Sequence, residues 1–231
     1  MKGRSLPPEV KKHIHLEVEV EWSGWANLKK KMVITDAICP KLSYHIGVIR
    51  RRKMKEEYLL KKHRALQLYD YHVWANNKFF GRLKELPKDI YDREIQSVFP
   101  SIAETLVHTY RGDTIWLGVM RENSMDEIQA SIAQAQEKTK DKGLEEMEKQ
   151  FRDLSEEYQI FLNNESDLDK EISPQHPQFG RLDTHLSQLV QHVVNHGTYH
   201  RGNLTAMIHQ QGYSSVPTDY VCYLYEISST K

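Results

Sequence analysis

Apolar residues recur at intervals of three, four and seven through most of the chain, the spacing of one buried helix face. The first of these stretches ends before Pro87, and the second begins at Ser101 with Glu104 three residues later, the signature of a capping box. Gly212 is well placed to stop the last one. The helices predicted in this way cover residues 54–86, 101–121, 126–164 with a break near 141–143, and 183–211. Four long amphipathic helices predict an all-α fold, a four-helix bundle.

The segments outside these helices have other patterns. Residues 165–182 hold prolines and a glycine and are predicted to form a loop or small hairpin, while the tail 213–231 is expected to pack back onto the bundle. Near the N-terminus, apolar residues alternate with polar ones from Ile14 to Trp22, a strand-like period, yet the sequence offers that strand no obvious partner. We therefore predict a functional domain over 54–231. Residues 1–53 would be a poorly ordered extension, or the product of a mis-assigned upstream start.

Composition narrows the function classes. Lys+Arg and Asp+Glu each number 32, so the near-zero net charge gives no electrostatic footprint for nucleic acid or for an anionic membrane surface. The 2 cysteines are too few for a disulfide framework or a thiolate metal site. No apolar run approaches the roughly 20 residues that span a bilayer, and no secretory signal is apparent at the N-terminus. A cytoplasmic protein with no nucleic-acid or membrane partner is the expectation.

Histidine is the unusual residue, with 12 copies, of which several fall in the last predicted helix. A helix advances about 100° per residue, so each side chain can be placed around its axis. His200 then falls inside the cluster of leucine, valine and methionine positions that marks the buried face. His196 lies on the flank of that cluster, and His192 lies at its edge. The pattern therefore predicts that His196 and His200 point into the bundle, one helical turn apart.

The histidine pair alone is weak support for a metal site, because 12 histidines in 231 positions produce about 0.6 such pairs by chance. His108, in the second predicted helix, shares a face with Gly112, Ile115 and Val119 and can meet the pair across the core. Three imidazoles leave coordination positions open, as in catalytic metal sites. The alternative is that each histidine is a hydrogen-bonded core residue. If the metal site is correct, His192 would be an outer residue that orients a ligand, or a substitute ligand. The other histidines carry less support, with His185 and His209 expected on the surface and His63 and His72 without a supporting pattern.

Three motifs stand out along the predicted helices: Tyr71-His-Val-Trp-Ala-Asn76, Ser101-Ile-Ala-Glu-Thr-Leu-Val-His108 followed by Trp116-Leu117, and His192-Val-Val-Asn-His-Gly-Thr-Tyr-His-Arg-Gly-Asn-Leu204. Together they resemble, over residues 60–212, the motifs of one known family, the DinB/YfiT-like superfamily. The first matches its Tyr-x-x-Trp-Ala-Asn signature, the second resembles the family helix with the first metal histidine, and the last is similar to the most specific family motif.

The resemblance implies a four-helix bundle with an up-down-down-up course and a three-histidine site. By motif position, the ligands of a divalent transition metal, zinc or nickel in many members, would be His108, His196 and His200. Asn203 departs from the family, which usually has glutamine there; this shortens a polar side chain near the site without removing a ligand. A homodimer formed through bundle faces is a further implication.

The reaction is less sharply indicated than the site. Relatives in the family include transferases and isomerases that use low-molecular-weight thiols such as bacillithiol, which implies a metal-dependent thiol transferase acting on an electrophilic small molecule. A bound metal with an open position lowers the pKa of a thiol and equally activates water, so a metal-dependent hydrolase is an alternative. A non-enzymatic stress-response metal-binding bundle is another. Tyr199 and Arg201 are candidate substrate contacts, although the helical count turns Arg201 about 100° from His200. No catalytic residue is assigned.

Overall fold

The computed structural model describes residues 16–18, 32–34 and 62–229, and the chain divides into two compact units, with the boundary in the sequence after Tyr58. In the first unit, strand β1 (Leu16–Val18) pairs antiparallel with strand β2 (Met32–Ile34), with Leu16 opposite Ile34. The predicted strand is confirmed at these positions, but the view that it lacks a partner was wrong. The partner segment shows too short an apolar run to stand out in the sequence. The predicted poor order of the rest of 1–53 lies outside the described residues.

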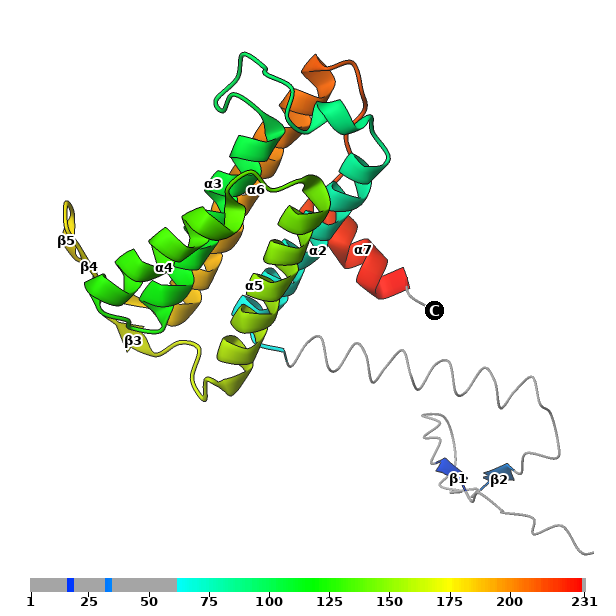
Figure 1. Ribbon diagram of the computed structural model, residues 1–231. Helices are drawn as coiled ribbons and strands as arrows, with labels where there is room; N and C mark the ends of the chain where they lie inside the picture. The colour runs from blue at the N-terminus through cyan, green and yellow to red at the C-terminus, as the bar shows by residue number, and fades with distance from the viewer. Residues whose placement is uncertain (1–15, 19–31, 35–61, 230–231) are drawn as a thin grey trace, which may run out of the picture. The chain divides into compact units, whose positions relative to one another are not determined.

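The second unit is mostly helical, as the apolar periodicity predicted (Figure 1). Its helices are α2 (Arg64–Lys84), α3 (Ile102–Met120), α4 (Met125–Thr139), α5 (Leu144–Asn164), α6 (Leu186–Gln210) and α7 (Tyr220–Ser229), with a 3-10 turn at Lys88–Ile90. No helix among the described residues is long and apolar enough to cross a membrane.

Helix ends follow the local chemistry of the sequence. The Ser101 hydroxyl accepts the backbone N–H of Glu104, and Gly212 follows α6 with φ +88°, a backbone angle that glycine adopts without strain. The predicted break of the third region lies at Lys140–Gly143. The first helix was predicted to run unbroken from residue 54, and this is wrong at one point: His63 has a non-helical backbone and caps α2 by accepting the N–H of Ala65. Residues 54–61 lie outside the described part.

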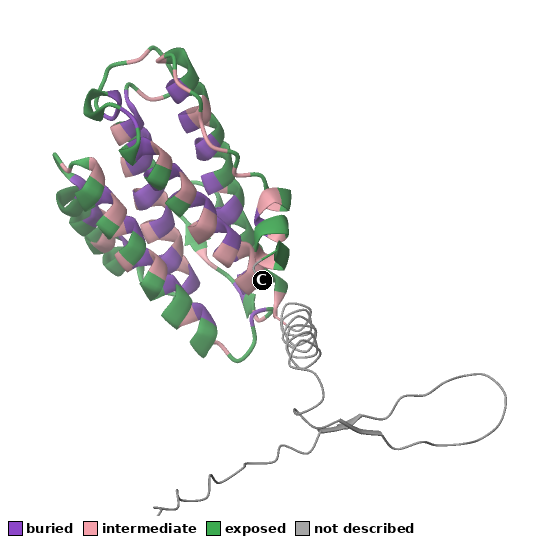
Figure 2. Cartoon of the chain, turned by 90° about the vertical axis from the view of Figure 1, so that its right-hand side faces the viewer, coloured by how far each residue is buried: buried purple, intermediate pink, exposed green. Residues whose placement is uncertain are grey.

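The core forms where α6 packs against α2 and α3, while α5 packs against the same two helices and α4 covers α3. Buried residues line the inward faces of these helices, and exposed residues line their outer faces (Figure 2). Large side chains such as Phe79, Tyr158 and Met207 are almost fully buried in this cluster. The burial of one stripe per helix is what stabilises such a helical domain.

Two smaller features complete the domain. Between α5 and α6, β3 (Glu171–Ile172) pairs with β6 (Thr184–His185), and β4 (Gln175–His176) pairs with β5 (Gly180–Arg181), which confirms the predicted hairpin. The C-terminal helix α7 packs on α2 through an aromatic cluster in which Tyr71 contacts Tyr220 and Tyr223. The tail therefore packs back onto the bundle, as predicted.

Candidate metal centre

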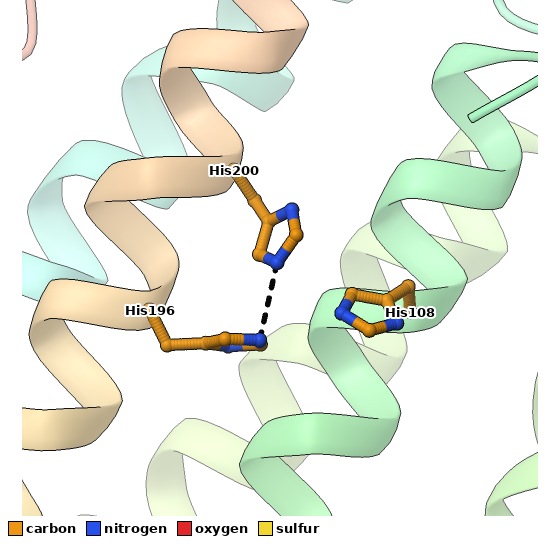
Figure 3. A group of neighbouring side chains, drawn as sticks. All are labelled: His108, His196 and His200. Atoms are coloured by element: carbon orange, nitrogen blue, oxygen red, sulfur yellow. Dashed lines mark hydrogen bonds between the residues drawn. The ribbon is translucent and has the colours of Figure 1, made fainter. Parts of the chain in front are cut away.

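Three imidazole rings from two facing helices converge on one point of the bundle (Figure 3). His108 projects from α3, and His196 and His200 project from successive turns of α6. One ring nitrogen from each residue lies within 4.8 Å of the corresponding nitrogens of the other two. The sequence predicted this grouping, and the structure brings the three residues together.

The two α6 rings are the closest pair. Nε2 of His200 lies 3.1 Å from Nε2 of His196, and the ring centroid of His108 lies 4.6 Å from that of His200 and 5.4 Å from that of His196. The exposure of the two α6 histidines follows the helical count, because His200 is buried and His196 is half-buried. His108 was predicted on a face turned to the core, but its side chain is exposed. The group therefore has one side embedded in the bundle and one side open to ligands.

Aromatic side chains surround the group. The ring of Phe99, which precedes α3, lies 4.8 Å from His108 and 5.5 Å from His200, measured between centroids. Tyr199 is well exposed and its ring lies 5.1 Å edge-on to His200. These rings limit the water around the imidazoles, and Tyr199 stays at the rim of the site, where a substrate contact remains an expectation.

The imidazoles are held in their neutral form. Burial lowers the pKa of His200 from its ordinary 6.5 to about 4, with further contributions from His196 and His108. Burial also lowers the pKa of His196, and burial together with Arg111 lowers that of His108. Neutral imidazoles at pH 7 keep a lone pair on each ring, which is the form that binds metal.

The donor set fits a divalent transition ion. For metal–nitrogen bonds of about 2.0–2.1 Å in a tetrahedral site, neighbouring nitrogens stand roughly 3.3 Å apart, and the 3.1 Å between His196 and His200 is close to that. The ligand atom of His108 lies within 4.8 Å of those of the pair. A Cβ added at Gly112 would stand 2.8 Å from Cε1 of His196, so the glycine leaves the space in which that ring lies. Three nitrogens and an open side match a site that retains exchangeable positions.

Asn203 reaches the outer nitrogen of one candidate ligand. Its side-chain Nδ2 lies 3.4 Å from Nδ1 of His200. Rotating the amide exchanges its oxygen and nitrogen, which places the oxygen to accept a proton from Nδ1. Nε2 of His200 would then be free to bind the ion. The shorter asparagine still reaches the ring at the position where the family usually has glutamine.

His192 is not part of the three-histidine group. It is exposed, its ring stands 6.2 Å from that of His196, and it packs edge-on to Trp116 at 4.4 Å. The helical count predicted this marginal position. Its assignment as an outer residue that orients a ligand stays a prediction. His185 and His209 are exposed, as expected.

A buried polar network beside the site escaped the sequence analysis. His72 on α2 is 1% exposed and its Nε2 lies 3.0 Å from Oδ2 of Asp113 on α3. Arg201 on α6 is 3% exposed, donates to Oδ1 of Asn76 at 2.9 Å and to Oγ1 of Thr198 at 2.8 Å. Arg201 is therefore part of the core and does not face the open side, contrary to the expectation of a substrate contact. In the sequence, the only sign that these polar residues are buried was their position, at helical spacing, on the apolar faces of their helices.

The class of protein is now defined by fold and site: a mostly helical domain in which three neighbouring histidines could hold a metal ion. The family model of the DinB family matches residues 54–229, and the chain belongs to that family. Protein DinB of Bacillus subtilis (strain 168) is 50% identical over 167 residues, which cover 72% of this chain and 97% of that protein. The family resemblance predicted from the motifs is thereby confirmed.

Proposed function

We propose that His108, His196 and His200 hold a divalent transition metal, zinc or nickel, and that the site transfers a low-molecular-weight thiol of the bacillithiol type to an electrophilic small molecule. The observation that carries this proposal is the group of three neutral imidazoles whose ligand atoms lie within 4.8 Å of one another, with one side open. Catalytic metal sites have three protein ligands and an exchangeable position, whereas structural sites are closed by four.

A divalent metal with an open position lowers the pKa of a bound thiol and so supplies the thiolate nucleophile at neutral pH. A positively charged side chain near the site also favours the thiolate form of the ligand. Arg111 is half-buried, lies one turn along α3 from His108 and has no ion-pair partner among the described residues. Its positive charge favours an anionic ligand. In the transfer, the thiol proton passes to solvent, a sulfur–carbon bond forms and the leaving group departs with the electron pair of its bond to carbon.

The surrounding residues would also restrict water. Phe99 contacts His108 and His200, and Trp116 packs against His192 next to the group. Apolar walls strengthen the attraction between charges in the site because they lower the local dielectric constant. A large soluble thiol enters such a site through its sulfur, while its polar part stays at the rim near Tyr199.

Metal analysis of protein purified without an affinity tag tests the site. The expected result is one equivalent of zinc or nickel, with loss of the metal in His108→Ala, His196→Ala and His200→Ala, and with retention in the matched control His209→Ala, which removes an exposed α6 histidine. Parent protein without stoichiometric metal would contradict the proposal. Unchanged metal in the three variants would do the same.

Thiol transfer is tested separately, with the metal-loaded protein, bacillithiol or a related thiol, and a chromogenic alkylating electrophile. We expect a rate above that of thiol and electrophile alone, and loss of this acceleration in His196→Ala. A rate no higher than the background would overturn the transferase assignment while leaving the metal site intact. Hydrolysis of ester or amide substrates without thiol would favour the hydrolase instead.

We further propose that residues 54–231 form the functional domain and that its four bundle helices are α2, α3, α5 and α6. These helices would follow an up-down-down-up course. Helix α4 makes this course possible, because it carries the chain back along the bundle between α3 and α5. The packing of α6 and of α5 against the same two helices supports this arrangement. A homodimer, a cytoplasmic location and a role in the stress response remain predictions from the sequence and the family.

A further inference from the structure

Two buried polar atoms next to the three-histidine group lack a hydrogen-bond partner among the described residues. They are Nδ1 of His196 and Oδ1 of Asp113. Nearly all buried polar atoms in proteins are paired, so each exception needs an explanation. One of these atoms belongs to a ring that can donate a proton, and the other belongs to a carboxylate that can accept one.

The two side chains are neighbours across the α3–α6 contact. A Cβ added at Gly112 would stand 3.3 Å from Nδ1 of His196, so this ring lies directly over the α3 backbone one residue before Asp113. The charge of Asp113 is also felt at the ring, where it raises the pKa of His196 against the larger lowering effect of burial. Both unpaired atoms are buried, and the ring of His196 lies against the turn of α3 that carries Asp113.

Asp113 is firmly positioned by its other contacts. It is 3% exposed, its Oδ2 lies 3.0 Å from Nε2 of His72, and its backbone oxygen accepts the hydroxyl of Tyr158 at 2.6 Å. With Oδ2 engaged on the α2 side, Oδ1 is the oxygen left for another donor. A buried carboxylate is costly unless its oxygens are hydrogen-bonded.

We propose that Asp113 Oδ1 accepts the Nδ1–H of His196 and thereby directs Nε2 of this ring to the metal. The inference rests on the proposed metal site. A histidine that binds metal through Nε2 carries its proton on Nδ1 and almost always donates it to a carboxylate, a carbonyl or water. With this bond formed, Asp113 is a positioning residue that acts through His196.

The second α6 ligand has an equivalent arrangement. Nδ2 of Asn203 lies 3.4 Å from Nδ1 of His200, and an amide turned to present its oxygen accepts the proton of that ring. Each α6 histidine would thus have its own acceptor, an amide for His200 and a carboxylate for His196. The carboxylate is the stronger acceptor, because hydrogen bonds to ionised groups are the strong ones.

The first test uses the full-length protein loaded with zinc, without substitution. Long-range nitrogen–proton NMR of the histidine rings, assigned with His196→Gln, reports which nitrogen of His196 is protonated. We expect a proton on Nδ1 that is shifted downfield and exchanges slowly with water. A metal-bound Nδ1, or a Nδ1 proton that exchanges as fast as that of the exposed His209, would overturn the inference.

The second test compares Asp113→Asn with His72→Gln, which removes the partner of the other carboxylate oxygen. Zinc affinity is measured by competition with a chromogenic chelator. We expect Asp113→Asn to bind zinc about 10–100-fold more weakly and to lose the downfield proton. His72→Gln should retain both, even if it unfolds at lower denaturant. Equal loss of zinc affinity in the two variants would assign Asp113 a structural role only, and unchanged affinity in a folded Asp113→Asn would refute the bond.

A double-mutant cycle of urea unfolding on the metal-free protein isolates the interaction from general loosening of the bundle. With His196→Ala as the background, Asp113→Asn should cost less stability than it does in the parent, because the ring that its oxygen contacts is already missing. An equal cost in the two backgrounds would overturn the inference. Failure of the proposed function is distinguishable: the parent protein itself would then bind no zinc.

Discussion

Replacing Gly112 by alanine should weaken metal binding without unfolding the protein. The added Cβ would stand 2.8 Å from Cε1 and 3.3 Å from Nδ1 of His196. Carbon atoms in contact rest about 3.5–4.0 Å apart, so the ring has to withdraw by roughly 0.7 Å or more. The obstacle is the side chain of His196, which can rotate, and not the backbone of α6. The substitution therefore displaces a candidate ligand and leaves the helices in place.

The size of the effect follows from how narrowly metals tolerate displaced ligands. Metal–ligand distances hold within about 0.2 Å, which is less than the displacement expected here. We expect zinc affinity to fall by about 10–100-fold, the range found when the support of a metal-binding histidine is removed. The free energy of unfolding should rise or stay unchanged, because alanine in a helix interior is favoured over glycine by about 1 kcal/mol and this offsets the cost of moving the ring.

Competition titration with a chelator measures the affinity, and urea unfolding measures the stability. Gly202→Ala is the matched control, since it lies in α6 near His200 and an added Cβ there meets nothing within 4 Å. The control should keep the affinity of the parent and gain stability. If Gly112→Ala also keeps the affinity of the parent, His196 is either no ligand or has more room than its contact with α3 indicates, and the assignment fails.

Three further predictions concern the core, the pH dependence and the domain boundary. Gly197→Ala should cost about 1–3 kcal/mol in urea unfolding, because the added Cβ would stand 2.6 Å from Nδ1 of the buried His72 and would overpack the core. A loss below about 0.5 kcal/mol would contradict this. In the metal-free protein, the free energy of unfolding should rise from pH 4 to 6.5 and level off above. The reason is that the pKa of His200 is lowered from 6.5 in the unfolded chain to about 4 in the folded protein, so between these values the unfolded chain binds the proton and the folded protein does not. His200→Asn should flatten this slope, and an identical slope in the variant would refute the lowered pKa of His200. Residues 54–231 expressed alone should fold and bind metal as the full chain does, measured by circular dichroism and metal content, and an unfolded or metal-free fragment would disprove the boundary.

The helices and the histidine group were predictable because each depends on local spacing. Ser101 and Gly212 mark helix ends through chemistry that acts within a few residues, and the structure confirms both. The helical count separated His200, His196 and His192 into buried, half-buried and exposed positions. A period of about 100° per residue is enough to rank side chains on one helix, provided that the buried stripe is clear.

The polar network was not predictable, since its members find their partners on other helices. An arginine in a sequence is expected at the surface, and Arg201 is buried because Asn76 on α2 and the face of Tyr71 receive its guanidinium, which lies 5.4 Å from the ring centroid. His72 likewise depends on Asp113, which is 41 residues away. The short strand partner Met32–Ile34 escaped notice for the same reason, because pairing depends on contacts between segments and not on the pattern within one.

Helix α6 explains why a metal site and a buried polar network occur together. The side chains of His196 and His200 point toward α3. The residue that follows each of them lies on the side of α6 that faces α2: Gly197 against the ring of His72, and Arg201 with its hydrogen bond to Asn76. Gly197 lets the ring of His72 lie against the helix, and Arg201 joins α6 to α2 through its hydrogen bond to Asn76. Such a directed bond favours one rotation of α6, which apolar packing alone specifies less sharply. A small rotation of α6 would carry both candidate ligands away from His108. The network thus sets the direction of the histidines, which accounts for a charged residue kept in the core beside the site.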